Sequence, residues 1–99
     1  MILYSTRARV VGYPPEVATW GAEIAKVAAN IVGTEITFAS RVGGHQEMLW
    51  TSRVNDMGAL EADLDKLQQS QQYTGMIKTA VDRGYFDPAS VETAIWRTN

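Results

Sequence analysis

The alternation of hydrophobic and polar positions divides the chain into six regular elements. Runs of β-branched and aromatic residues favour strands, whereas apolar residues at three- and four-residue steps favour amphipathic helices. Strands are predicted over residues 2–11, 34–42, 45–54 and 91–97, and helices over residues 17–31 and 57–81. The order is therefore strand, helix, strand, strand, helix, strand, without an internal repeat.

Signals at the helix ends support both helices. Two prolines, Pro14 and Pro15, suit the first turn of the first helix, because the first N–H groups of a helix have no partner within it. Gly33 fits a glycine cap at the C-terminus of that helix. Asp56 provides an N-cap for the second helix. The polar run 68–72 contains no apolar residue, which predicts a break or an exposed turn in the second helix.

The Gly-Gly pair at residues 43–44 predicts a two-residue turn between the second and third strands. In that register Phe38 lies opposite Leu49, and the side chains of Met48 and Trp50 lie on the other face. Large apolar residues then occupy both faces of the hairpin. A sheet covered by helices on one side only is expected to alternate cleanly between apolar and polar positions.

The order of elements predicts an α+β, ferredoxin-like βαββαβ fold in a single domain over residues 1–99. Right-handed crossovers place both helices on one face of a four-stranded antiparallel sheet. The uncovered face carries apolar residues, and leaving them in water costs roughly 25 cal/mol per Å². Pairing with a second copy removes this cost, so we expect a homodimer in which two sheets form an α/β barrel.

Composition narrows the class of protein. The 99 residues are 45% hydrophobic and 20% charged, with a net charge of −2 and no cysteine. These values exclude an intrinsically disordered chain, a disulfide framework and a cysteine-containing metal site. The slightly acidic balance argues against nucleic acid as a partner. No apolar stretch approaches the ~20 residues of a membrane span, and no secretory signal is evident, so we expect no membrane partner and a cytoplasmic location.

Four segments carry a resemblance to a known group of proteins. They are GGHQEMLWTSR at residues 43–53, LEA at 60–62, QQY at 71–73 and SVETAIWR at 90–97. Together they resemble the dimeric α/β-barrel superfamily, and most of all its small NIPSNAP-like proteins, over the whole chain. The resemblance implies a homodimer. It implies no single activity, because relatives range from monooxygenases and haem-degrading enzymes to proteins without known chemistry.

Candidate chemistry is sparse, since phosphate-loop, dinucleotide, zinc-protease and serine-hydrolase motifs are absent. His45 is the only histidine, and it is either a proton-transfer group or haem ligand, or a polar residue beside the hairpin turn. Arg7 and Arg9 share one face of the first strand and are candidates for binding an anionic substrate group. The alternative is structural ion pairing with Glu47 or Glu92. We expect no metal site, because no second histidine or cysteine is available.

Trp50 and Tyr73 are candidates to line a mostly apolar substrate pocket between the sheet and the helices. The alternative places them in the core or the dimer interface, and Trp20, on the buried stripe of the first helix, is expected in the core. Three acidic residues of the second helix are expected to form a solvated, charged surface: Glu61, Asp63 and Asp65.

Two function classes follow. The first is a NIPSNAP-like small homodimeric protein without established activity, which binds a small molecule or serves as an assembly module and needs no cofactor. The second is a cofactor-independent monooxygenase-like enzyme for a small aromatic or anionic metabolite. In the second, Arg7 and Arg9 orient the substrate, His45 transfers a proton, and Trp50 or Tyr73 shapes the pocket. An enclosed pocket with His45 or an arginine pointing inward favours the enzyme, whereas a solidly packed space excludes it.

Overall fold

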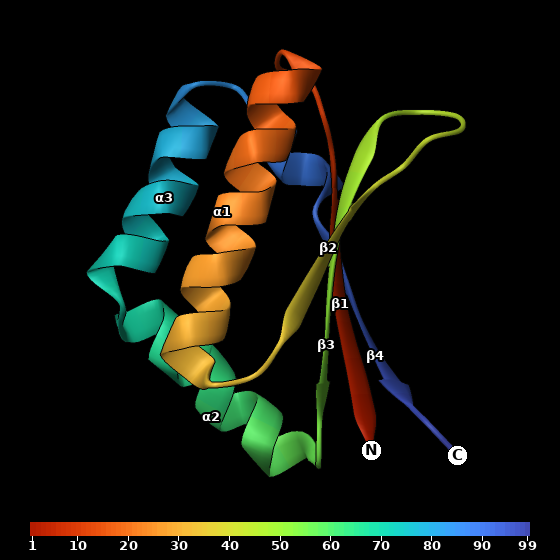
Figure 1. The fold of residues 1–99 in the computed structure, drawn as a ribbon, viewed down its shortest axis with the longest axis vertical. Coiled ribbons are helices and arrows are strands. Elements are labelled where there is room, and N and C mark those ends of the chain that lie inside the picture. The colour runs from red at the N-terminus through yellow and green to blue at the C-terminus, as the bar shows by residue number, and fades with distance from the viewer.

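The computed structural model describes residues 1–99 as two layers, with three helices on one face of a sheet (Figure 1). The strands are β1 (Ile2–Arg9), β2 (Ile36–Ser40), β3 (Glu47–Val54) and β4 (Glu92–Arg97). The helices are α1 (Pro14–Val32), α2 (Met57–Gln69), α3 (Gln71–Asp82) and a short 3-10 helix, η1 (Pro88–Ser90). The predicted ferredoxin-like βαββαβ order is confirmed, with the second helix divided into α2 and α3.

The four strands form one antiparallel sheet in the order β2-β3-β1-β4. All three long helices lie on the same side of this sheet, and no element covers the other side (Figure 1). We call these the covered face and the open face. Pairing across the strands places eight larger side chains on the open face: Leu3, Arg7, Arg9, Glu47, Leu49, Arg53, Glu92 and Trp96.

Local signals set the helix ends as predicted. Gly33 adopts the left-handed conformation (φ 73°), and its N–H closes the last turn of α1. The Asp56 carboxylate accepts a hydrogen bond from the N–H of Ala59 at 2.8 Å and so caps α2. The predicted break in 68–72 falls at Ser70, whose hydroxyl caps the start of α3. No helix combines the length and the apolar character that a membrane crossing requires.

The connection between β2 and β3 differs from the prediction. Residues 41–46 form a loop, and only the second glycine of the pair at residues 43–44 has a positive φ, of 84°. A type I′ turn needs positive φ at both central positions. Arg41 ties the two ends of the loop together, since its Nη1 donates to Oε1 of Glu47 at 2.9 Å. The predicted two-residue turn is therefore wrong, and His45 lies in the loop rather than on a strand.

The longer loop shifts the register of the hairpin by one residue. Phe38 lies opposite Trp50, and Leu49 lies opposite Ala39. Successive side chains of a strand point to opposite faces, so Phe38, Met48 and Trp50 share the covered face. The predicted register is wrong, as is the prediction that Met48 and Trp50 lie on the face opposite Phe38. The apolar residue that β3 contributes to the open face is Leu49.

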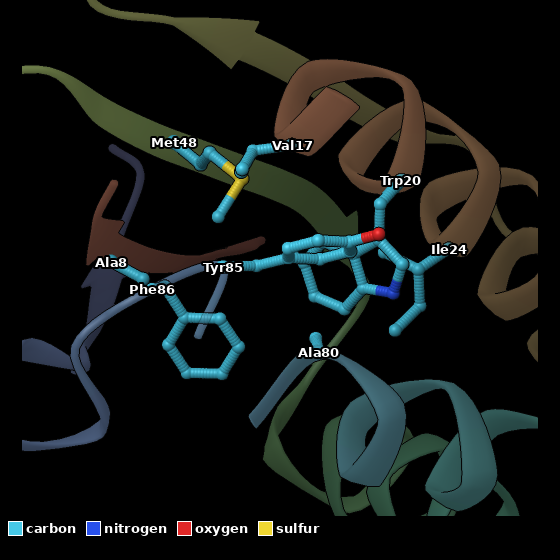
Figure 2. Packing of buried hydrophobic residues seen from close by; sticks show 8 residues of the cluster. All are labelled: Ala8, Val17, Trp20, Ile24, Met48, Ala80, Tyr85 and Phe86. Carbon is cyan, nitrogen blue, oxygen red and sulfur yellow. The ribbon is translucent and has the colours of Figure 1, made fainter. Parts of the chain in front are cut away.

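The main core lies between α1, α3 and the sheet, where side chains from elements far apart in sequence point toward one another (Figure 2). Its buried members are Ala8, Val17, Trp20, Ile24, Met48, Ala80, Tyr85 and Phe86. Trp20 is at its centre, with its ring centroid 6.0 Å from that of Tyr85 and 5.8 Å from that of Phe86. The expected core position of Trp20 is confirmed.

Candidate functional site

A cavity of about 560 Å³ lies between the covered face of the sheet and the helices. It is lined by 25 residues from every strand and every long helix, and 17 of them are hydrophobic. The volume falls within the ~300–1,000 Å³ that small-molecule sites in proteins occupy, and such sites are also mostly apolar with a few polar groups. The space between sheet and helices is therefore not solidly packed.

Two tryptophans form a rigid wall of the cavity. The indole N–H of Trp50 donates to the carbonyl oxygen of Gly21 at 3.0 Å, and that of Trp20 donates to the carbonyl oxygen of Met76 at 3.2 Å. The two rings pack edge to face, with centroids 5.9 Å apart and an interplanar angle of 88°. Gly21 also lets the ring of Phe38 pack closely against α1, because a Cβ there would lie 2.4 Å from Cε1 of Phe38. Both indole N–H groups are thus occupied, and the rings offer hydrocarbon surface to a ligand.

Hydroxyl groups supply most of the polarity of the cavity. Tyr4, Thr6 and Thr93 line it from the sheet, and Tyr73 lines it from α3. Burial raises the pKa of the Tyr73 hydroxyl above its usual range, and the neighbouring Tyr4 adds to this rise. Tyr73 therefore remains protonated at neutral pH and keeps an O–H that can donate a hydrogen bond to a ligand.

Solved structures share the fold of the chain, although no family model and no curated protein sequence matches it. An uncharacterized NIPSNAP domain protein from Burkholderia xenovorans has a TM-score of 0.81 at 13% identity, covering 100% of this chain and 95% of its own. A NIPSNAP family protein from Agrobacterium tumefaciens strain C58 has a TM-score of 0.80 at 17% identity, covering 99% and 92%. SnoaB, a cofactor-independent oxygenase from Streptomyces nogalater, has a TM-score of 0.72 at 14% identity, covering 99% and 92%.

The chain has the fold of the dimeric α/β-barrel superfamily. The resemblance in the sequence to this superfamily and to its NIPSNAP-like members is thereby confirmed. At 13–17% identity the three comparisons establish the fold. They do not establish the activity, which depends on the residues of the site. NIPSNAP proteins and monooxygenases are both among the similar structures, so both predicted function classes are compatible with this α/β-barrel fold.

Helix α2 contributes a cavity residue, Asp63, that was not predicted from the sequence. Asp63 is half-buried and lines the cavity, whereas Glu61 and Asp65 are exposed. The prediction that all three form one solvated surface is wrong for Asp63. A signal was present, because Asp63 follows Leu60 by three residues and precedes Leu67 by four, which places it on the inward stripe of the helix.

Trp50 and Tyr73 are the two predicted site residues that the structure brings together, since both line the cavity. Arg7 and Arg9 lie on the open face, on the opposite side of the sheet from it. The guanidinium of Arg7 is paired with the carboxylate of Glu92 at 2.8 Å, which matches the ion-pair alternative.

His45 is exposed in the loop 41–46 and does not line the cavity. No cluster of three or more histidine, aspartate or glutamate side chains is arranged to hold a metal ion. The polar groups that line the cavity are therefore hydroxyls, the amide of Gln68 and the carboxylate of Asp63.

Proposed function

We propose that the protein binds a small organic molecule in the cavity between its sheet and helices. The observation that carries this proposal is the cavity itself, about 560 Å³ with a largely hydrophobic lining. A concave, mostly apolar space of this size that also carries a few polar groups is typical of small-molecule sites. The Trp50–Gly21 and Trp20–Met76 hydrogen bonds support the proposal as well, because they hold the aromatic wall in place before a ligand arrives.

The test is calorimetric titration with 2-naphthylmethanol, a neutral aromatic probe that carries one hydroxyl group. Ala28→Phe adds a ring at a buried, cavity-lining position of α1, and Ala62→Phe adds the same ring at an exposed position of α2. The wild type and Ala62→Phe should bind the probe, whereas Ala28→Phe should not. Circular dichroism spectra of both variants serve as the control for folding. Equal binding by Ala28→Phe, or no binding by the wild type, would refute the proposal.

We also propose that the protein is a homodimer joined through the open face. Leu49 and Trp96 are 37% and 59% exposed there, and covering apolar surface of this kind contributes roughly 25 cal/mol per Å². The Arg7–Glu92 pair on the same face balances positive and negative charge, so this face does not repel its own copy. This face is opposite the cavity, so dimer formation leaves the ligand site accessible.

Light scattering after size-exclusion chromatography tests the dimer. The wild type should have twice the chain mass at micromolar concentration, and Leu49→Asp should have the mass of one chain. Val42→Asp is the matched control, because Val42 is fully exposed in the loop 41–46 and lies outside the sheet. A monomeric wild type, or an unchanged mass for Leu49→Asp, would contradict the proposed interface.

A cofactor-independent monooxygenase is the second candidate, favoured by the carboxylate of Asp63 in a cavity of the same fold as SnoaB. In this reaction class Asp63 accepts a proton from a CH₂ group that is activated by a neighbouring carbonyl. The resulting carbanion reduces O₂, and CH₂ plus O₂ become C=O plus H₂O. Oxygen uptake with anthrone tests this candidate: catalysed uptake should be lost in Asp63→Asn and kept in Asp65→Asn. If the protein binds 2-naphthylmethanol but does not catalyse oxygen uptake with anthrone, the monooxygenase candidate is refuted and the binding function stands.

A further inference from the structure

We propose that the cavity selects its ligand by charge and takes a lipophilic amine in preference to a carboxylate of the same shape. This inference rests on the proposed binding function and adds the chemical class of the ligand. It also departs from the expectation of an anionic metabolite, which depended on Arg7 and Arg9. Both of those side chains lie on the open face, away from the cavity.

The first observation is the charge of the lining. Among its 25 residues there is no lysine, arginine or histidine, and Asp63 is the single charged side chain. A ligand carboxylate in this cavity would lose water without gaining an opposite charge, and burying an unpaired ion is strongly unfavourable. An ammonium group would instead meet the carboxylate of Asp63, the one acidic group in the lining.

The second observation is that the carboxylate of Asp63 has no cationic partner within the chain. Ion pairs within 4.0 Å join other residues: Arg7 to Glu92, Arg41 to Glu47, Lys78 to Asp82, and Arg83 to Glu16. Asp63 nevertheless occupies the apolar stripe of α2, between the turns that carry Leu60 and Leu67. Its carboxylate is therefore free to pair with a cation on a ligand.

The third observation concerns the aromatic wall. The N–H groups of Trp20 and Trp50 are already used by helix carbonyls, so they cannot stabilise a ligand anion. What remains is ring surface, mainly that of the half-buried Trp50, because Trp20 is only 8% exposed and stacks on Phe86. The π-surface of such a ring attracts cations rather than anions. Charge, the unpaired carboxylate and the aromatic surface therefore favour the same class of ligand, an apolar molecule with one ammonium group.

Three probes with one naphthalene ring and one substituent carbon test the inference: 2-naphthylmethylamine, 2-naphthylmethanol and 2-naphthoate. Dissociation constants are measured by calorimetry at pH 7 for the wild type, Asp63→Asn and Asp65→Asn. Asparagine keeps the shape of the side chain and removes only its charge, and Asp65 is an exposed acid on the same helix. The wild type should bind the amine about tenfold or more tightly than the carboxylate. Asp65→Asn should keep this preference, and Asp63→Asn should lose it.

The outcomes separate the charge selection from the binding function. If the carboxylate binds the wild type as tightly as the amine while the alcohol also binds, charge selection is refuted and the proposed function stands. If none of the three probes binds, both are refuted. If Asp65→Asn loses the preference for the amine as much as Asp63→Asn does, the preference comes from the net charge of the protein, and the role of Asp63 is refuted. Asp63→Glu, which restores the charge, should restore the preference for the amine, and its failure to do so would also count against that role.

Discussion

Two helix glycines provide a matched pair for testing how closely α1 approaches the sheet. Replacement of glycine by alanine inside a helix stabilises it by about 1 kcal/mol, because alanine has the higher helix propensity. At Gly75 in α3 a Cβ would have no neighbour within 4 Å, so Gly75→Ala should gain the full amount. For a domain of this size that gain raises the melting temperature by roughly 4–8 °C.

The same change at Gly21 meets the ring of Phe38. A Cβ there would lie 2.4 Å from Cε1 and 2.5 Å from Cζ of that ring, whereas carbon atoms in contact prefer about 3.5–4.0 Å. Overpacking of this kind typically costs about 1–3 kcal/mol. The gain in helix propensity of about 1 kcal/mol offsets part of this cost. The net effect of Gly21→Ala should therefore be to lower the free energy of unfolding by about 1 kcal/mol. The two variants should then differ by about 2 kcal/mol.

Urea unfolding followed by circular dichroism measures both variants at one fixed protein concentration, because a dimer makes stability depend on concentration. Phe38→Ala supplies the second half of a double-mutant cycle: without the ring, Gly21→Ala should become neutral or stabilising, with a coupling of at least about 1 kcal/mol. If Gly21→Ala stabilises the protein as much as Gly75→Ala, then α1 stands further from β2 than described. In that case the described contact between Trp50 and Gly21 would also be wrong.

Three further changes probe the core, the polar network and the cavity. Met48→Ala should lower the free energy of unfolding by about 2–5 kcal/mol in urea, since the side chain is 1% exposed, and a loss below ~1 kcal/mol would contradict its burial. Tyr85→Phe removes a hydroxyl that donates to Glu16 at 2.7 Å and accepts from Arg83 at 3.3 Å, and it should cost about 1 kcal/mol in the same assay, whereas no change would show that the network is not formed. Because the pKa of Tyr73 is raised on folding, the unfolded chain loses this proton first, and stability should fall as the pH rises above about 10. Tyr73→Phe should make that fall shallower in melts between about pH 9 and 11, and equal slopes would argue against the burial of Tyr73.

Most of the fold was predictable because its signals are local. The cap at Asp56 and the break at residues 68–72 involve neighbours along the chain, and periodicity alone located all six elements. The register of the β2–β3 hairpin was not predictable in this way. It depends on the length of the loop 41–46 and on which strand residues are buried against the helices, and the Gly-Gly pair suggested a shorter turn. A shift of one residue was enough to exchange the faces of Leu49 and Trp50 relative to Phe38.

The site was predictable only in part, for a different reason. Trp50 and Tyr73 were identified from residue type, but a cavity is the volume that many side chains together leave unfilled, and no single segment encodes it. Asp63 was assigned to a charged surface because its neighbours Glu61 and Asp65 are acidic. The leucine spacing of α2 was the better guide, since the position on a helix decides which way a residue points. Arg7, whose charge suggested an anion site, has its partner in Glu92 on the open face.

The three tryptophans allow the central claim to be tested in one experiment. Trp20 and Trp50 line the cavity, and Trp96 lies on the open face, 59% exposed. The indole N–H signals of a ¹⁵N-labelled sample report on each of them separately during a titration with 2-naphthylmethylamine. Binding in the cavity predicts that the signals of Trp20 and Trp50 shift in a saturable manner while that of Trp96 does not. Saturable shifts confined to Trp96, or no saturable shift at all, would contradict the claim that this cavity is the functional site.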